Sequence, residues 1–177
     1  MHQRTVIRHA VRDLLVAAGV ADGRVFASRV LPFRGQELPL VTVYTLDETT
    51  ASEGSTAPRE LTRTLPLVIE GWAAPGQNAD DNMDALALEI ETAMHADPFL
   101  GGEAADSILD ATVMEVTEAG ERQIGLVILT YTFTYRTLAP EPPADGEMDD
   151  FVTVGADHDA AGAVASDLFD VQVPDES

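Results

Sequence analysis

The side chains that could perform chemistry do not form a recognisable catalytic set. The four histidines stand far apart, at positions 2, 9, 95 and 158. The sequence contains no nucleophile elbow, no glycine loop for phosphate and no HExxH motif. It also contains no cysteine, which excludes disulfides, thiolate metal sites and cysteine nucleophiles. We therefore predict that the protein is not an enzyme and needs no cofactor.

One short acidic segment has the opening of a calcium-binding loop. Asp157, His158 and Asp159 stand where such a loop has its first ligands. The fifth position would be Ala161 and the twelfth, normally a bidentate glutamate, would be Leu168. Because neither side chain offers an oxygen, we predict no metal site there.

Two other acidic groups could also carry chemistry. Asp80, Asp81 and Asp84 lie at the start of a predicted helix, where negative charge is favourable beside the helix dipole. Glu70 has no histidine or second acid nearby in the sequence to complete an acid and base pair. We interpret the aspartates as helix capping and predict no catalytic residue.

The charge of the chain limits its partners. The formal net charge is −21 over 177 residues, and all ten basic residues are arginines. Phosphate neutralisation by Lys and Arg provides most of the affinity of DNA-binding proteins, so we expect no specific DNA binding. The N-terminus lacks the continuous apolar core of a signal peptide and no run reaches membrane-spanning length, so we expect a cytosolic protein without membrane contact.

The element that must organise the fold is a long strand at residues 122–136, RQIGLVILTYTFTYR. Alternate residues point to opposite faces of a strand, so one face carries the large side chains and the other ends in threonines. A strand of this length requires long partners or a neighbouring subunit, and we expect one small domain not to satisfy it. The large side chains are those of Val127, Leu129, Tyr131, Phe133 and Tyr135.

The remaining pattern predicts two helices and several shorter strands. Apolar residues recur at helical spacing over residues 5–18, with Gly19 as terminator, and over residues 78–96, with Asn78 as cap. Residues 24–30, 40–46, 59–72 and 108–117 have strand composition, and Pro66 requires a bulge or an edge position. The last of these forms a hairpin with the long strand.

We thus predict an α/β protein of the α+β kind. It has a mixed, mainly antiparallel sheet with two helices packed on it, in the order α-β-β-β-α-β-β. This domain covers residues 1–138, and an acidic C-terminal extension covers residues 139–177.

Two segments fall outside this pattern. Residues 47–58 are small and polar, which predicts a mobile loop that is either a plain hairpin tip or a segment that orders against a partner. The extension carries eleven acids and no arginine, and its short apolar patches are FVTV and LFDVQV. It is either a solubilising tail or an arm that adds a strand to the sheet edge of a neighbour.

Arginines follow one stripe of the first predicted helix. Arg4, Arg8 and Arg12 are four residues apart, so they stack on one exposed face. This stripe is either a solvated surface or a docking stripe for an acidic neighbour. Other copies of this acidic chain would be suitable neighbours.

Several segments together resemble one family of virion proteins. They are RVFASRVLPFRGQELPLVTVYTLDE, RELTRTLPLVIEGWA, DDNMDALALEIETAM, the LGG at residues 100–102 and IGLVILTYTFTYRT. Over residues 4–138 the chain resembles the tail terminator proteins of long-tailed bacteriophages, the minor tail protein U group. The resemblance lies in a pattern over many segments and in no single diagnostic motif.

The resemblance implies a structural role at the tail-neck junction of a virion. It implies a hexameric ring that caps the tail tube, stops its polymerisation and offers a surface to the head connector, with DNA passing through unbound. Assembly would take place in the cytoplasm of the host bacterium. The alternative is a neck or head-completion adaptor bound on the portal side.

Candidate contact residues for such an assembly come from four segments. They are the arginine stripe, the acids of the predicted loop, the threonine-faced end of the long strand and the two apolar patches of the extension. In full they are Arg4, Arg8, Arg12, Asp47, Glu48, Glu53, Thr130, Thr132, Thr134, Arg136, Phe151, Val152, Phe169 and Val171.

Overall fold

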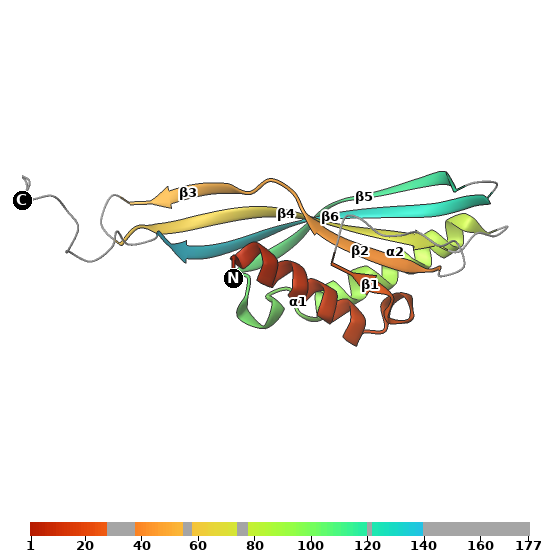
Figure 1. The fold of residues 1–177 in the computed structure, drawn as a ribbon, viewed down its shortest axis with the longest axis horizontal. Helices are drawn as coiled ribbons and strands as arrows, with labels where there is room; N and C mark the ends of the chain where they lie inside the picture. Colours follow the sequence, from red (N-terminus) through yellow and green to blue (C-terminus); the bar gives the residue numbers. More distant parts are fainter. Residues whose placement is uncertain (28–37, 55–57, 74–77, 120–121, 140–177) are drawn as a thin grey trace, which may run out of the picture. The chain divides into compact units, whose positions relative to one another are not determined.

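A six-stranded β-sheet carries two α-helices on one face (Figure 1). This computed structural model describes residues 1–27, 38–54, 58–73, 78–119 and 122–139. The α+β fold class is confirmed, with one strand more than predicted between the helices. The elements are α1 (Gln3–Ala17), η1 (Val20–Gly23), β1 (Val25–Phe26), β2 (Leu40–Thr45), β3 (Thr49–Glu53), β4 (Glu60–Ala73), α2 (Ala79–Ala96), η2 (Leu100–Gly102), β5 (Asp106–Ala119) and β6 (Arg122–Leu138).

The sheet has the order β1-β2-β4-β6-β5, and β3 pairs with β4. Only the short β1–β2 pair is parallel, whereas every other pair is antiparallel. β5 and β6 form the predicted hairpin, and β5 lies at the end of the strand order. The sheet is therefore mixed and mainly antiparallel, as the sequence indicates.

Helix α1 has the pattern that the sequence predicts. Ile7, Val11 and Leu15 are fully buried and four residues apart, so one stripe faces the core. The helix ends before Gly19, whose φ of 76° is the left-handed conformation typical of a glycine after a helix. The predicted terminator is confirmed.

Strand β6 lies at the centre of the sheet. Val127, Leu129, Tyr131, Phe133 and Tyr135 are all at most 2% exposed, which confirms the predicted apolar face. The expectation that one domain could not satisfy this strand is wrong. β4 pairs with residues 125–138 and β5 with residues 122–134, because both partners are long strands of 14 residues.

Pro66 lies opposite a bulge, as the sequence predicts. Thr45 pairs with Leu67 and Thr49 pairs with Thr64, so three residues of one chain segment oppose two of β4. The Pro66 carbonyl accepts a 2.8 Å hydrogen bond from the Leu46 amide on this side. The proline nitrogen, which has no hydrogen, thus belongs to a strand whose neighbour is irregular at that point.

The prediction of a mobile loop over residues 47–58 is wrong in its first half. Residues Thr49–Glu53 form β3, which pairs with residues 60–64 of β4. Residues 55–57 lie outside the described part of the chain. The segment TTASE has no large apolar side chain, and backbone pairing with β4 orders it instead.

Helix α2 packs closely on β4 and β6. An added Cβ at Gly71 would lie 2.8 Å from Cδ2 of Leu86, and one at Gly125 would lie 2.7 Å from Cγ of Met83. These two glycines therefore let the helix approach the sheet. The predicted cap is wrong in one respect, because the Asn78 side chain makes no capping hydrogen bond. The Asp80 and Asp81 carboxylates do lie in the first turn.

Candidate subunit interface

Three strand segments extend beyond the helices and form an arm. They are β3, residues 60–64 of β4 and residues 134–138 of β6, paired in the order β3-β4-β6. Figure 1 shows them projecting past the N-terminal end of α1, so neither helix covers them. We call this three-stranded unit the arm. Because no described helix covers the arm, it can contact another protein.

A buried ion pair lies at the root of the arm. Oε1 of Glu48 is 2.6 Å from Nη1 of Arg63, and the two side chains are only 7% and 21% exposed. Nε of Arg63 donates to Oγ1 of Thr137 at 2.9 Å, and the Tyr135 hydroxyl donates to Oε2 of Glu48. Glu48 follows β2, Arg63 belongs to β4 and the other two residues belong to β6. The cluster therefore ties three chain segments together.

Burial and the Glu48 carboxylate act together on Tyr135. Burial disfavours the phenolate, and both the hydrogen bond to Glu48 and its negative charge raise the Tyr135 pKa further. The nearby guanidinium groups of Arg63 and Arg4 oppose this rise. Tyr135 therefore keeps its proton, and remains a hydrogen-bond donor, at pH values well above the ordinary pKa of a tyrosine.

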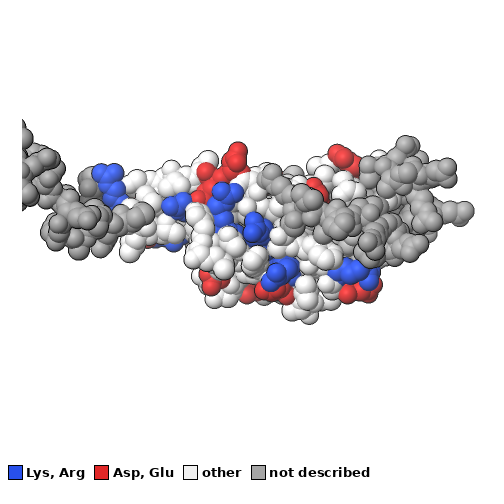
Figure 2. Space-filling view, in the orientation of Figure 1, with Lys and Arg blue, Asp and Glu red and all other residues white. Residues whose placement is uncertain are grey.

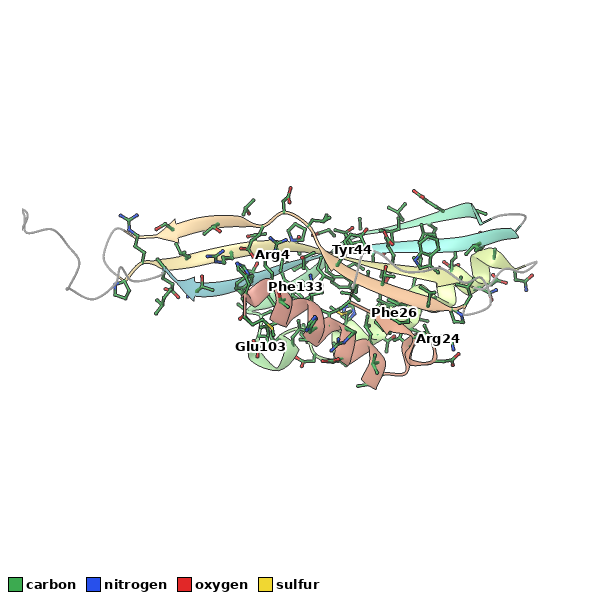
Figure 3. The ribbon with its side chains drawn as sticks, in the orientation of Figure 1. Arg4, Arg24, Phe26, Tyr44, Glu103 and Phe133 are labelled. Carbon is green, nitrogen blue, oxygen red and sulfur yellow. The ribbon has the colours of Figure 1, made fainter. Side chains whose placement is uncertain are left out.

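Helix α1 contacts the same root through its first arginine. Nη2 of Arg4 donates to the Leu46 carbonyl at 2.7 Å and to Oγ1 of Thr45 at 3.4 Å. Figure 3 shows Arg4 in the first turn of α1, beside the place where the chain passes from β2 to β3. The arginine stripe, the predicted loop and the end of the long strand meet at this point, although they are far apart in sequence.

The rest of the stripe is not the fully exposed face that its spacing predicts. Arg8 is half-buried, and its Nε has no hydrogen-bond partner within the described ranges. Arg12 pairs at 2.7 Å with the adjacent Asp13. The role of these arginines in docking stays a prediction.

The threonines of β6 lie on the sheet face away from the helices. Thr130, Thr132 and Thr134 are half-buried. Oγ1 of Thr132 donates at 2.5 Å to Oδ2 of Asp110, the residue at the bulge in β5. Thr132 is therefore already engaged within the subunit, and its role in an interface stays a prediction.

The tip of the arm carries exposed side chains of mixed chemistry. Leu138 is 65% exposed. Arg136 is also exposed, with its Nη1 3.5 Å from Oε1 of Glu60 in a weak surface pair. Asp47 is exposed beside the arm root, in contrast to its neighbour Glu48. An apolar residue next to an arginine is a suitable composition for a protein contact.

The side chains of five predicted contact residues lie outside the described part of the structure. Glu53 belongs to β3 and pairs with Glu60 through its backbone, but its side chain is outside the described part. The four residues of the extension, Phe151, Val152, Phe169 and Val171, lie outside the described ranges.

Sequence reasoning missed the partners that make Glu48 an internal residue. Arg63, Tyr135 and Thr137 are all near the arm root, and none follows from a local motif. A second missed cluster lies on the helix-free face, where the Glu70 carboxylate accepts from the hydroxyls of Tyr44 at 2.5 Å and Thr42 at 3.3 Å. In both cases the carboxylate and its partners come together only through strand pairing.

On the face drawn in Figure 2, the charged side chains of the described residues do not separate into large patches. Figure 2 shows arginines spread along the visible face, with acidic side chains beside several of them. Among the described residues, no group of three or more His, Cys, Asp or Glu side chains is placed to hold a metal ion. None of the described helices has both the length and the apolar character of a membrane span.

Comparison with known proteins gives a likeness to solved structures but none to a family model or curated protein. No family model and no curated protein matches the sequence. A chain of the solved structure titled "Virion of native gene transfer agent (GTA) particle" aligns with 72% of this chain and 94% of its own length, at 16% identity and a TM-score of 0.30. An alignment at that identity and TM-score carries no information about activity or partners.

Proposed function

We propose that the protein is a ring-forming structural protein of a phage-like virion, and specifically a tail terminator. It caps the tail tube, stops its polymerisation and provides the joining surface to the head connector. The support is the resemblance over residues 4–138, together with the α+β sheet and two packed helices that this resemblance implies. In this role the protein performs no chemistry, and its function is to make contacts.

The arm is suited to the contacts of a ring. A closed ring requires heterologous contacts, in which one surface of each copy meets a different surface of the next. The arm projects from its own helices, and the buried Glu48–Arg63 pair fixes its root. A projecting element with a fixed direction can reach a neighbouring copy without a large loss of conformational entropy on binding.

The charge supports a passage that DNA crosses without binding. The chain carries −21 net charge, and a wall with that sign repels the phosphate backbone. We therefore expect no retention of DNA at physiological salt. A protein that held DNA at this position would impede its movement through the ring.

The mass of the oligomer in solution tests the ring. We expect native mass spectrometry of the purified chain, alone or with tail tube protein, to give a species of six copies of the 18.9 kDa chain. Electron microscopy should show that species as a ring. A chain that stays monomeric at every concentration and with tube protein present would overturn the proposal.

A pull-down from an assembly reaction separates the two candidate positions. A tagged chain should retain the tail tube if it is a tail terminator. A neck or head-completion adaptor would instead retain the portal side of the head and no tube. Recovery of portal protein without tube would replace the terminator with the adaptor.

A further inference from the structure

Strand β5 carries acids on the sheet face away from the helices. Oδ2 of Asp110 accepts from Thr132, whose side chain lies on that face. Glu115 pairs with Leu126, and the two residues of a cross-strand pair share a face. Leu126 follows Gly125, where an added Cβ would meet α2, so Leu126 and Glu115 point away from the helices.

This face of β5 is accessible and partly apolar. Val113 is two residues from Glu115, and Ile108 pairs with Thr132, so both apolar side chains lie on the same face as the acids. Val113 is 45% exposed and Ile108 is 56% exposed. Asp110 and Glu115 are exposed too. We call these four exposed residues, Ile108, Asp110, Val113 and Glu115, the acidic face of β5.

Helix α1 carries the opposite charge on the other side of the sheet. The arginine stripe of Arg4, Arg8 and Arg12 follows this helix, and Figure 2 shows basic side chains at the surface along it. Residues 1–27 contain four arginines and two acids, whereas residues 96–121 contain seven acids and no arginine or histidine. The sheet therefore separates a basic surface from an acidic one within the subunit.

The arginine stripe has charge that its own subunit does not neutralise. No ion pair joins Arg8 to a carboxylate of the described part, and its buried Nε has no hydrogen-bond partner there. A half-buried charge without an anion is unfavourable. Arg12 pairs with the adjacent Asp13 at the surface, and such pairs contribute little. A carboxylate supplied from outside the subunit would therefore be favourable at both arginines.

We propose that the arginine stripe of one copy binds the acidic face of β5 of the next copy. This inference rests on the proposed ring and names two surfaces that meet in it. Because the sheet lies between them, one subunit cannot join its own stripe to its own acidic face. Each copy thus has a basic surface for one neighbour and an acidic surface for the other, which is the heterologous contact that a closed ring requires.

The two surfaces are similar in length and complementary in chemistry. Arg4 to Arg12 extends about 12 Å along a helix, and Asp110 to Glu115 extends roughly 16 Å along a strand. Long arginine side chains can bridge the difference, and their planar guanidinium groups pair well with carboxylates. The exposed Val113 between the two acids can pack against the apolar stems of the arginines.

Charge reversal in two separate chains tests the contact. The first chain carries Arg8→Glu/Arg12→Glu and the second carries Asp110→Arg/Glu115→Arg. Each chain alone places like charges at every contact, so we expect association to weaken by about tenfold or more in analytical ultracentrifugation. An equal mixture of the two chains should associate within about threefold of the parent. Every contact in that mixture joins opposite charges, and the two chains alternate around the ring.

A matched control separates this contact from a general effect of net charge. Asp81→Arg/Asp84→Arg changes the net charge as much as the second chain does, at exposed positions in the first turn of α2. We expect it to associate like the parent and not to restore association when mixed with the first chain. Restoration by this control would show that net charge alone decides association and would overturn the proposal.

Charge removal covers the case in which a reversed chain does not fold, as circular dichroism would show. Arg8→Gln/Arg12→Gln and Asp110→Asn/Glu115→Gln should each weaken association by about threefold or more, and added salt should reduce their difference from the parent. Association equal to the parent in the folded variants, or a mixture that stays dissociated, overturns the proposal.

The same measurements keep this inference distinct from the proposed ring. A ring of six copies in the parent and in each folded reversed chain would overturn the contact and leave the ring. Charge-dependent association of the parent into a number of copies other than six, alone and with tube protein, would overturn the ring and leave the contact.

Discussion

At the scale of single residues, Glu48 holds the root of the arm. We expect Glu48→Gln to lower the free energy of unfolding by about 1–3 kcal/mol, because Arg63 and Tyr135 lose a charged acceptor in a mostly buried site. Urea denaturation measures this difference. The control is Asp47→Asn, which makes the same change at the exposed neighbour and should stay within about 0.5 kcal/mol of the parent. Equal effects of the two variants would contradict the structure.

The two tyrosines of β6 offer a second matched comparison. The Tyr135 hydroxyl donates to Glu48, whereas the buried Tyr131 hydroxyl has no hydrogen-bond partner in the described part of the chain. We expect Tyr135→Phe to cost about 1.5–3 kcal/mol of stability at neutral pH, since it removes a hydrogen bond to a charged group. Tyr131→Phe should be close to neutral. Chemical denaturation at pH 7 distinguishes them, and a larger loss for Tyr131→Phe would be the contrary result.

The same tyrosines predict an alkaline limit to stability. Burial and the charge of Glu91 raise the pKa of Tyr131 to about 12, and the pKa of Tyr135 is also raised. A raised pKa in the folded state means that the folded protein keeps its proton while the unfolded chain loses it. Stability should therefore be constant with respect to these groups below about pH 10 and fall as the pH rises toward 12. Unfolding measured from pH 8 to 11.5 should show a shallower fall in each Phe variant than in the parent.

Residue types alone could not identify the acids that act inside the protein. Asp47 and Glu48 are adjacent and equally acidic, yet one is exposed and the other is bound by Arg63 and Tyr135. The difference depends on which way the chain turns at the bulge opposite Pro66. The proline predicts a bulge but not its side-chain directions. Thr132, which the sequence predicts at a contact surface, is similarly hydrogen-bonded to Asp110, which lies at the bulge in β5.

At the scale of elements, the contact between α2 and the sheet depends on two glycines. We expect Gly71→Ala to destabilise by about 1–3 kcal/mol, because its Cβ would meet branched side chains of Leu86 and Val127 at 2.8 and 2.9 Å. Gly125→Ala should cost less, since its Cβ meets the flexible side chain of Met83. Thermal unfolding compares the two. A greater loss for Gly125→Ala would show that Met83 cannot move aside.

Elements with apolar periodicity could be predicted, and one without it could not. The two helices and strands β2, β4 and β6 show their burial in their sequence pattern, as the fully buried Ile7, Ile90 and Leu129 illustrate. Strand β3 has only small and polar side chains. Hydrogen bonds to β4 order this strand, and its local sequence pattern does not predict them. Pairing also explains why the long strand needs no second subunit, because the lengths of β4 and β5 are a tertiary property.

At the scale of the whole molecule, the proposed ring predicts that substitutions on the arm weaken association of the subunits more than substitutions on helix α2. Leu138 on the arm and Leu88 on α2 are 65% and 66% exposed, so they form a matched pair. We expect Leu138→Asp to weaken association at least tenfold and Leu88→Asp to leave it unchanged, with both monomers folded. Analytical ultracentrifugation measures association, and circular dichroism checks the fold. Loss of association only in Leu88→Asp would place the contact on the helical layer.

The bulge opposite Pro66 has a consequence for how the sequence can diverge. In β2 the odd-numbered residues pair with odd-numbered residues of β4, whereas in β3 the odd-numbered residues pair with even-numbered ones. Because of the extra residue, odd-numbered residues lie on one face of the sheet in β2 and on the opposite face in β3. If the bulge were kept, removing one residue from positions 46–48 would shift β3 by one residue along β4 and exchange its two faces. The number of residues between β2 and β3 can therefore change by one only if the bulge is lost or the two faces of β3 are exchanged.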